Sequence, residues 1–431
     1  MVLKIKTKIF RIIYKVMGLL KPLLVVIIPT NIRKHAKQTL IKMASSNKRK
    51  KASGLKGIQF IEGINLVGYA RAEMGIGESC RLAANSMNTV GLPFGILNFE
   101  GTNSARMSDL TWIHKEVSSP SFSVNVFHVN AEQMAEINAF YGDFLFNNRY
   151  NVGYWHWELP EFPNEWNDSF SLVDEIWVAS TFVAESISIK SPVPVVKIPH
   201  AIEVKITEPR DRTYFKLPEE AFLFLTMFDF NSYQERKNPR ASIEAFKLAF
   251  EPDNMDVGLV VKVNGHKNNL EELESLIKLT SNYENIYIIQ ETLSRNDVNA
   301  LISVTNCFIS LHRSEGFGLV MAEAMYLGKP VIGTNWSSNT DFMNVSNSCP
   351  VEYELISLGQ DYGPYKSGQY WAEPNVRHAS EYMTKLVNDR EYYNRISSAG
   401  ELFIKSNYSP RVIGELIKKR LNYIHMWKFG G

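Results

Sequence analysis

"CFISLHRSEGFGLVMAEAMYLGKPVIGTNW", Cys307–Trp336, is the stretch that decides the fold. It starts with an apolar segment of strand type, makes a glycine-bounded turn at Ser314–Gly318, and continues as an apolar helix to Gly328. A second strand pattern begins at Lys329. A strand, a helix and another strand in this order predict a parallel strand pair with a covering helix. Ligands bind at the carboxyl ends of such strands.

The same alternation of strand and helix patterns fills the chain from Gly57 onward. A polar segment with two prolines, Glu203–Glu220, interrupts it and predicts a linker. We therefore expect an α/β fold in which two Rossmann-like domains, each with a parallel sheet, face each other across a cleft. The predicted boundaries are 1–56 for an N-terminal extension, 57–205 for the first domain, 206–405 for the second, and 406–431 for a C-terminal helix that packs back on the first domain.

The composition is that of a folded protein with one strongly basic segment. Of the 431 residues, 45% are hydrophobic and 12% aromatic, enough to bury sizeable cores. The three cysteines share no metal-type spacing, as expected of thiols in a reducing compartment. The chain carries 47 Lys plus Arg, 15 of them between Met1 and Ile61, where no Asp or Glu occurs. The rest of the chain has 32 basic and 45 acidic residues, which gives it a net charge of −13.

The basic segment is patterned like a helix that lies on a membrane surface. Its basic face is Lys4, Lys8, Arg11 and Lys15, and its apolar face is Ile5, Ile9, Ile12, Val16 and Leu19. The apolar run Val16–Ile28 is shorter than the about 20 residues that a spanning helix needs. We expect residues 1–51 to bind an anionic membrane at its cytoplasmic inner face. A solvated tail is the alternative, and nucleic acid is not the expected partner because it needs no apolar face.

Two glutamates frame the turn and the helix of the opening stretch. Glu315 stands at the carboxyl edge of the predicted sheet, and Glu323 lies about 9 Å further along. Two such acceptors can bind hydroxyl pairs at both ends of one extended ligand, while backbone N–H groups at the helix start meet an anionic middle. A nucleotide sugar has this layout. The alternative is a pair of exposed glutamates, but the apolar neighbours of Glu323 would make an unpartnered carboxylate costly.

The spacing Glu315-x7-Glu323, inside "SLHRSEGFGLVMAEAMYLGKPVIGTNWSSNTDF", resembles the motif of the glycosyl transferases group 1 family, whose members are retaining glycosyltransferases with the GT-B fold. The resemblance covers the chain beyond the N-terminal extension. It implies that the donor sugar meets Glu315 and the turn residues Gly316, Phe317 and Gly318. It also implies that Glu323 holds the ribose.

A second motif, "FDFNSYQERKNPRASIEAF", resembles the first strand–helix unit of the family's C-terminal domain, where a basic pair grips the diphosphate. The resemblance implies this role for Lys237, and Arg236 is the candidate for the second cation. In the family an arginine usually stands about five positions before the lysine, where this chain has Ser232. Cations are needed because a leaving nucleoside diphosphate accumulates negative charge. The alternative is a solvated basic pair, which is unfavourable beside a helix N-terminus.

Two further loops resemble parts of the family's donor site. In "GYARAEMGIGESC", after the first strand, we expect Gly75 and Gly77 to let the backbone approach phosphate and acceptor, with a plain tight turn as the alternative. In "NWSSNTDF", Ser338 and Asn339 stand at a predicted helix start and would face the diphosphate.

The strand end "NVGYWHWELPEFP" carries the candidates for chemistry at the anomeric carbon. His156 matches a histidine of related enzymes by position, and Glu158 is the competing candidate. Trp155 and Trp157 could stack on a sugar ring. The alternative for His156 is a strand-end histidine satisfied by packing. Two other strand-end histidines are expected to be structural or to line the cleft, His128 and His200.

The sequence therefore predicts a retaining glycosyltransferase that moves a hexose-type sugar from a nucleotide-diphosphate donor to a glycan or lipid-linked acceptor, as in bacterial-type surface polysaccharide assembly. The expected catalytic residues are His156, Glu158, Lys237 and Glu315. No metal is expected, since no Asp-x-Asp pair stands out at a strand end, and no cofactor beyond the donor itself. A non-catalytic binding subunit is the alternative, because the upstream arginine is missing. A phosphorylase or an epimerase is less expected.

Overall fold

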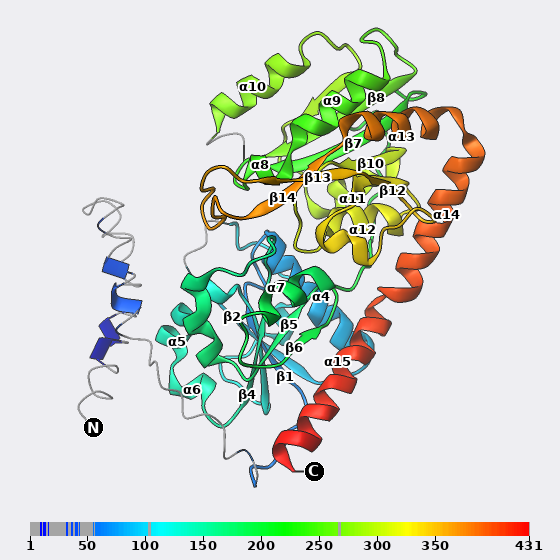
Figure 1. Cartoon of the computed structure of the whole chain (residues 1–431). Coiled ribbons are helices and arrows are strands. Elements are labelled where there is room, and N and C mark those ends of the chain that lie inside the picture. The colour runs from blue at the N-terminus through cyan, green and yellow to red at the C-terminus, as the bar shows by residue number, and fades with distance from the viewer. Residues whose placement is uncertain are drawn as a thin grey trace.

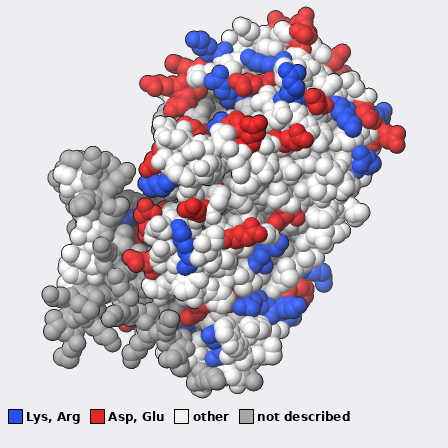
Figure 2. Space-filling model, in the orientation of Figure 1, with Lys and Arg blue, Asp and Glu red and all other residues white. Residues whose placement is uncertain are grey.

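Two parallel sheets of six strands, one in each half of the chain, form the structure (Figure 1). This computed structural model describes residues 55, 57–101, 105–265 and 269–430 and scattered positions between 9 and 43. The predicted membrane anchor, residues 1–51, lies largely outside the described residues. None of the described helices is both long and apolar enough to cross a bilayer. On the face drawn in Figure 2, acidic and basic side chains of the described residues are interspersed.

The first sheet has the strand order β2-β1-β3-β4-β5-β6, and every neighbouring pair is parallel. Its strands are β1 (Ile64–Gly68), β2 (Phe94–Asn98), β3 (Val124–His128), β4 (Tyr150–Tyr154), β5 (Glu175–Val178) and β6 (Val195–Lys197). Its α-helices are α4 (Gly75–Thr89), α5 (Met134–Tyr141), α6 (Asp143–Phe146) and α7 (Thr181–Ser188). Strands β1, β3, β4 and β5 are buried along their whole length, because both faces of the sheet are covered.

The second sheet has the order β12-β11-β10-β7-β8-β9 and is also parallel. Its strands are β7 (Phe222–Asp229), β8 (Val257–Asn264), β9 (Ile286–Ile289), β10 (Cys307–Ser310), β11 (Val331–Thr334) and β12 (Cys349–Val351). Its helices are α8 (Gln234–Lys237), α9 (Pro239–Ala249), α10 (Leu270–Thr280), α11 (Arg295–Val304), α12 (Leu319–Tyr326), α13 (Val376–Asn388) and α14 (Arg390–Asn407). The predicted α/β architecture of two Rossmann-like domains is confirmed.

A β-hairpin that the sequence analysis did not predict joins the two domains. Strands β13 (Tyr353–Ser357) and β14 (Tyr370–Pro374) pair antiparallel, apart from both large sheets. Side chains of the hairpin belong to the hydrophobic cluster of the first domain, namely Leu358, Tyr365 and Trp371. The hairpin therefore extends from the second domain and packs its apolar side chains on the first.

The C-terminal helices join the domains along another side of the molecule. Helix α14 packs on α12 of the second domain, and α15 (Pro410–Ile424) packs on α4 of the first. Figure 1 shows the two helices running past both domains. The approach of α15 to α4 is close: a Cβ on Gly414 would lie 2.4 Å from the carbonyl oxygen of Ser86. The hairpin and α15 thus hold the two sheets on either side of one cavity.

Candidate active site

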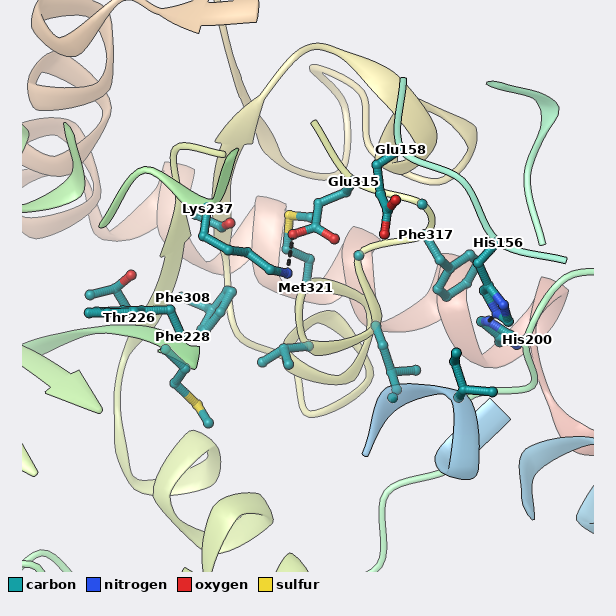
Figure 3. A pocket seen from close by; sticks show the side chains of 18 of the residues that line it. His156, Glu158, His200, Thr226, Phe228, Lys237, Phe308, Glu315, Phe317 and Met321 are labelled. Atoms are coloured by element: carbon teal, nitrogen blue, oxygen red, sulfur yellow. Dashed lines mark hydrogen bonds and ion pairs between the residues drawn. The ribbon is translucent and has the colours of Figure 1, made fainter. Parts of the chain in front are cut away.

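A cavity of about 360 Å³ lies between the two domains. The first domain contributes the start of α4 and residues that follow β3, β4 and β6. The second contributes residues from β7, β10 and the end of α8, and the turn and first residues of α12. The polar side chains in its lining are Asn130, His156, Glu158, His200, Thr226, Lys237, Ser310 and Glu315. Both parallel sheets thus present the carboxyl ends of strands to the cavity (Figure 3).

The turn that carries Glu315 is shaped by two glycines. Gly318 precedes α12 with a φ of +90°, a conformation that side chains disfavour. A Cβ on Gly316 would lie 3.2 Å from the carbonyl oxygen of Trp157, which belongs to the other domain. Phe317 is 4% exposed and anchors the turn in the core. The turn is therefore packed against the end of β4 and directs Glu315 to the cavity.

Two cations stabilise the charge of Glu315. The Nζ of Lys237 forms an ion pair with Oε1 of Glu315 in the cavity (Figure 3). Nη1 of Arg236 lies 3.5 Å from Oε2. Burial alone would raise the pKa of Glu315, but the charges of Lys237 and Arg236 outweigh it and hold the pKa to about 2. The carboxylate is therefore ionised at neutral pH, and the cation expected from the sequence lies beside it.

Arg236 itself does not line the cavity, although it adjoins Lys237 in the sequence. Its side chain is buried, and Nη1 donates to the carbonyl oxygen of Ser314 at 2.9 Å. Nη2 donates to Oγ of Ser232 at 3.3 Å, so the guanidinium reaches back to the position where the family has its arginine. The ring of Tyr365 lies 5.9 Å from the guanidinium carbon. Because these donors face protein groups, Arg236 supports Glu315 rather than supplying a second cavity cation.

Glu323 is buried beneath Arg295 and does not line the cavity. Arg295, the first residue of α11, forms an ion pair with Oε1 of Glu323. Its Nη2 also lies 3.8 Å from Glu78 of α4, in the other domain. Burial raises the pKa of Glu323 against the opposing charge of Arg295, and Oε2 is buried without a hydrogen-bond partner. Glu323 is therefore not exposed, which rules out the alternative interpretation of a glutamate on an exposed helix face. That Glu323 binds a ribose stays a prediction.

A chain of hydrogen bonds holds the two cavity histidines in neutral forms. Oη of Tyr154 donates to the carbonyl oxygen of Ile198 at 2.7 Å. Because its one hydrogen is used there, Nδ1 of His200, 3.2 Å from the same Oη, must be the donor of that pair. Nε2 of His200 is then an acceptor, and Nε2 of His156 donates to it at 3.3 Å. Burial lowers the pKa of His156 to about 4 and also lowers that of His200.

His156 and His200 therefore line the cavity as uncharged groups near neutral pH. Nδ1 of His156 is buried without a partner, so the expectation that packing alone satisfies this histidine is not met. His128 lies outside the cavity lining. Its Nδ1 is 3.0 Å from Oγ of Ser79, and its ring stacks on Tyr154 with the ring centroids 4.4 Å apart. The structure therefore agrees with a structural role for His128 and with a cavity-lining position for His200.

Glu158 lines the cavity and is held from the second domain. Tyr365, between the two strands of the hairpin, donates from Oη to Oε2 of Glu158 at 3.2 Å. Oγ of Ser314 donates to the main-chain carbonyl of Glu158. A Cβ on Gly316 would lie 3.6 Å from Cγ of Glu158. Figure 3 shows Glu158 beside Glu315, so carboxylates from both domains meet in one cavity.

Several other residues that were predicted to lie at the donor site instead have structural roles. Trp155 and Trp157 are 0% and 1% exposed, so the prediction that they stack on a sugar ring is wrong. Gly75 lines the cavity, but Gly77 does not. A Cβ on Gly77 would lie 2.2 Å from the carbonyl oxygen of Ala72, so this glycine permits a close backbone approach within the first domain.

Ser338 and Asn339 also lie outside the cavity lining, because protein groups already engage them. Oγ of Ser338 bonds to Oγ of Ser180 at 2.7 Å across the domain interface. Oδ1 of Asn339 lies 3.0 Å from Nε2 of His312, and Nδ2 donates to the carbonyl oxygen of Thr334 at 2.9 Å. The segment is a 3-10 helix, residues 337–341, and its polar side chains fix the interface rather than face the cavity.

Sequence reasoning missed two residues, Arg295 and Tyr365. Arg295 is a cation at the first position of a helix, where the dipole disfavours it, and that misplacement was a usable signal. Tyr365 lies between two β-type segments separated by a glycine-containing turn, a hairpin signal that was not used. Within the described ranges, no group of three or more His, Cys, Asp or Glu could hold a metal ion.

Two Rossmann-like domains that face each other across a ligand-sized cavity define the GT-B class of proteins. Solved structures of this class share the fold over 84% of the chain. They include sucrose-phosphate synthase from Thermosynechococcus elongatus, with a TM-score of 0.63, 11% identity and 99% of that chain covered. Alr3699/HepE from Anabaena, in complex with UDP and glucose, has a TM-score of 0.58, 12% identity and 100% of that chain covered.

The resemblance to the family is supported in the second domain, where residues 215–403 match the family model of the glycosyl transferases group 1. A curated relative is the alpha-1,3/1,6-mannosyltransferase ALG2 of Dictyostelium discoideum, 25% identical over 207 residues. The alignment covers 45% of this chain and 44% of that protein, so the chain spans less than half the length of this relative.

Proposed function

We propose that the protein is a retaining glycosyltransferase, which moves a sugar from a nucleotide-diphosphate donor to a hydroxyl group of an acceptor. The observation that carries the proposal is the ion pair of Lys237 and Glu315 in the cavity, just before the first turn of α12. It sets a cation where a diphosphate would lie and a carboxylate where sugar hydroxyls would lie. The family match supports this assignment, as does the binding of UDP and glucose by a protein of the same fold.

Lys237 would stabilise the negative charge that the leaving diphosphate gains as its bond to the anomeric carbon breaks. Leu319, Val320 and Met321, in the first turn of α12, also line the cavity. The backbone N–H groups of a first helical turn have no intrahelical acceptor and favour anions. The acceptor oxygen would bond to the anomeric carbon on the face that the diphosphate leaves. A phosphate oxygen would take the acceptor's proton, so the anomeric configuration is kept and no metal is required.

Of the two candidates for supporting charge at the anomeric carbon, we favour Glu158. The transition state of sugar transfer carries positive charge on the ring, which a carboxylate stabilises. His156 is neutral near pH 7, and its Nε2 is committed to His200. His156 can therefore accept a hydrogen bond at Nδ1, but it carries no charge.

For the acceptor we propose a glycan or a lipid-linked glycan of surface polysaccharide assembly. The support is the sequence of residues 1–51, whose basic and apolar helical faces suit an anionic membrane. The protein would then work as a peripheral enzyme at the cytoplasmic face. The membrane would concentrate an acceptor that is itself anchored there.

A panel of nucleotide sugars, offered with free and lipid-linked glycans, tests this function. We expect turnover of at least one donor, unchanged by EDTA, and a first-formed glycoside that keeps the donor's anomeric configuration by NMR. An inverted anomer would contradict the same-face mechanism, and loss of activity in EDTA would contradict metal independence. Nucleotide binding without transfer or donor hydrolysis would instead favour the non-catalytic subunit.

A further inference from the structure

Helix α15 exposes a group of apolar side chains at its end, where it continues into a π-helical turn, His425–Phe429. Tyr423, Met426 and Trp427 are 46%, 64% and 47% exposed. Their spacing of three and four residues places them on one face of the helix, and we call them the α15 tip. The chain has eight tryptophans, all within the described residues, and Trp427 is the most exposed of them. The α15 tip is therefore an exposed apolar surface.

The surroundings of the α15 tip are basic. From Leu416 onward the sequence has no Asp or Glu and four basic residues, Lys418, Lys419, Arg420 and Lys428. Arg420 is committed to the buried carboxylate of Glu175, whereas no carboxylate of the described residues forms an ion pair with the three lysines. The nearest acidic residue along the helix, Glu415, lies 11 positions before Met426, which is about 16 Å. The tip is thus flanked by positive charge that can meet an anionic surface.

The segment that leads to the basic N-terminal residues packs beside the α15 tip. The ring of Phe60 stacks on that of His425, with the centroids 4.1 Å apart, and lies 5.0 Å from that of Phe429. Leu55 is 2% exposed and belongs to the same hydrophobic cluster as Phe429. Lys51, the last residue of the basic segment, is four positions before Leu55, and four residues span at most about 14 Å. The proposed membrane anchor therefore joins the folded body next to the tip.

We infer that the α15 tip docks on an anionic lipid bilayer, as a second contact beside the one proposed for residues 1–51. The inference rests on that proposed membrane attachment. Tyr and Trp favour the boundary between water and hydrocarbon, because their rings are apolar and carry one polar group. Nζ of Lys428 lies 3.7 Å from the centre of the Trp427 ring, so its ammonium can reach a lipid phosphate while its stem covers the apolar side chain.

The size and the position of the α15 tip favour a membrane over a second copy of the chain. A stable protein interface buries about 1,200–2,000 Å² in total, which three side chains at the end of one helix do not supply. The ion pair of Arg420 with Glu175, the first residue of β5, places this end of α15 at the start of a strand. Figure 1 shows it on the side of the first domain that faces away from the second. A bilayer docked there leaves the cavity uncovered.

The tip and residues 1–51 are expected to act together, because each contact alone is weak. A small buried apolar area gives marginal and reversible membrane binding, and stable attachment takes two signals. Since the two contacts leave the folded body side by side, they can meet one bilayer at once. The tip therefore adds to the binding by residues 1–51, does not replace it, and fixes the orientation of the first domain on the membrane.

Fluorescence quenching by brominated lipids tests whether the tip enters the bilayer. The full-length chain is added to vesicles of phosphatidylcholine and phosphatidylglycerol in equal amounts, with or without bromine on the acyl chains, which quenches tryptophan only at close range. Residues 1–51 contain no tryptophan, so their insertion gives no signal. We expect bromination to lower the emission of the wild type but not that of Trp427→Phe. Equal quenching of the two, or no quenching of a wild type that co-sediments with the vesicles, would overturn the inference.

Affinity for the same vesicles gives a second measurement. Trp427→Ser should weaken binding about 3- to 10-fold, because it removes apolar area that is partly buried on docking. The control Leu248→Ser changes a side chain that is 52% exposed on α9 of the second domain, and it should keep the wild-type affinity. Donor hydrolysis should be unchanged in both variants, since neither residue lines the cavity.

Two further outcomes would assign the tip differently. A wild-type dimer that Trp427→Ser converts to a monomer would identify the tip as an interface between copies of the chain and overturn the membrane contact. If the full-length chain does not bind anionic vesicles at all, the proposed anchor fails together with the tip. Vesicle binding by the wild type without a contribution from Trp427 refutes the tip alone, which distinguishes the two.

Discussion

Replacement of Glu323 by alanine tests whether the nucleoside end of the donor lies beneath Arg295. Glu323 is 2% exposed, and only Oε1 is paired, through Arg295, while Oε2 has no partner. A ribose that reaches this carboxylate would have two hydroxyl donors for it. Loss of a hydrogen bond to a charged group costs about 1.5–3 kcal/mol, which is about 10- to 150-fold in affinity. At a buried position water cannot replace the lost acceptor, so we expect the upper part of that range.

The assay is titration of the full-length protein with UDP and with 2′-deoxy-UDP. The wild type should prefer UDP, because the deoxy analogue lacks one donor for Glu323. Glu323→Ala should weaken UDP binding strongly and bind the two nucleotides alike. Glu352→Ala, at a side chain that is 77% exposed, controls for the general loss of a carboxylate.

Removal of Glu323 also leaves Arg295 without its closest partner, so folding needs a separate control. Glu323→Gln keeps the side-chain volume and one carbonyl oxygen, and it removes a buried charge whose pKa burial has raised. It should melt near the wild-type temperature and bind UDP between the wild type and the alanine variant. If Glu323→Ala binds UDP as tightly as the wild type and keeps the same preference over 2′-deoxy-UDP, the ribose assignment is refuted.

Three further predictions concern Lys237, the N-terminal residues 1–51 and the buried His128. Lys237→Met should lower kcat by about 100- to 1000-fold, because charge on the leaving group peaks in the transition state. Lys405→Met, at an exposed ion pair, should leave kcat unchanged. An equal effect of both variants would show that Lys237 does not take part in catalysis. Deletion of residues 1–51 should abolish binding to anionic vesicles in a co-sedimentation assay without abolishing donor hydrolysis. Binding of the full chain to these vesicles should weaken as the salt concentration rises. Salt-independent binding to neutral vesicles would contradict an electrostatic anchor. Burial lowers the pKa of His128 to about 3, so below pH 6.5 the unfolded chain binds a proton that the folded state does not, and the free energy of unfolding decreases as the pH falls. In urea titrations the wild type should lose about 2 kcal/mol more of this free energy than His128→Asn between pH 7 and pH 5. Equal losses would refute the buried neutral histidine.

The two domains were predictable because parallel strands leave a simple trace in the sequence. Strands buried on both faces are mostly apolar, as β8 and β11 are, and the helices between them need room, so the alternation can be recognised without knowledge of contacts. The hairpin β13–β14 was not predicted, since its strands are partly exposed and belong to neither large sheet. The position of Tyr365 against Glu158 joins residues 207 positions apart, and no local pattern encodes such a contact.

Neighbours in the sequence were the other source of error at the site. Arg236 and Lys237 are adjacent, and the sequence treats them as one basic pair. In a helix, successive side chains point about 100° apart, so in the short helix α8 one can face the cavity while the other faces the core. The glycine-bounded turn, in contrast, was predictable as a unit, because Gly318 has a φ of +90° and a Cβ on Gly316 would lie 3.2 Å from the carbonyl oxygen of Trp157.

The Lys237–Glu315 pair also constrains what the ligand must be. A partly buried ion pair that loses one member leaves an uncompensated charge, which costs more than the pair contributes. A ligand that draws Lys237 away must therefore bring negative charge of its own, and it must also offer hydroxyl donors to Glu315, whose pKa of about 2 keeps it ionised. A free sugar satisfies only the second demand, and a nucleoside diphosphate has no hydroxylated ring on the far side of its diphosphate. A molecule in which a diphosphate adjoins a hydroxylated ring meets both demands at once, so the pair of Lys237 and Glu315 favours a nucleotide sugar over either of its parts.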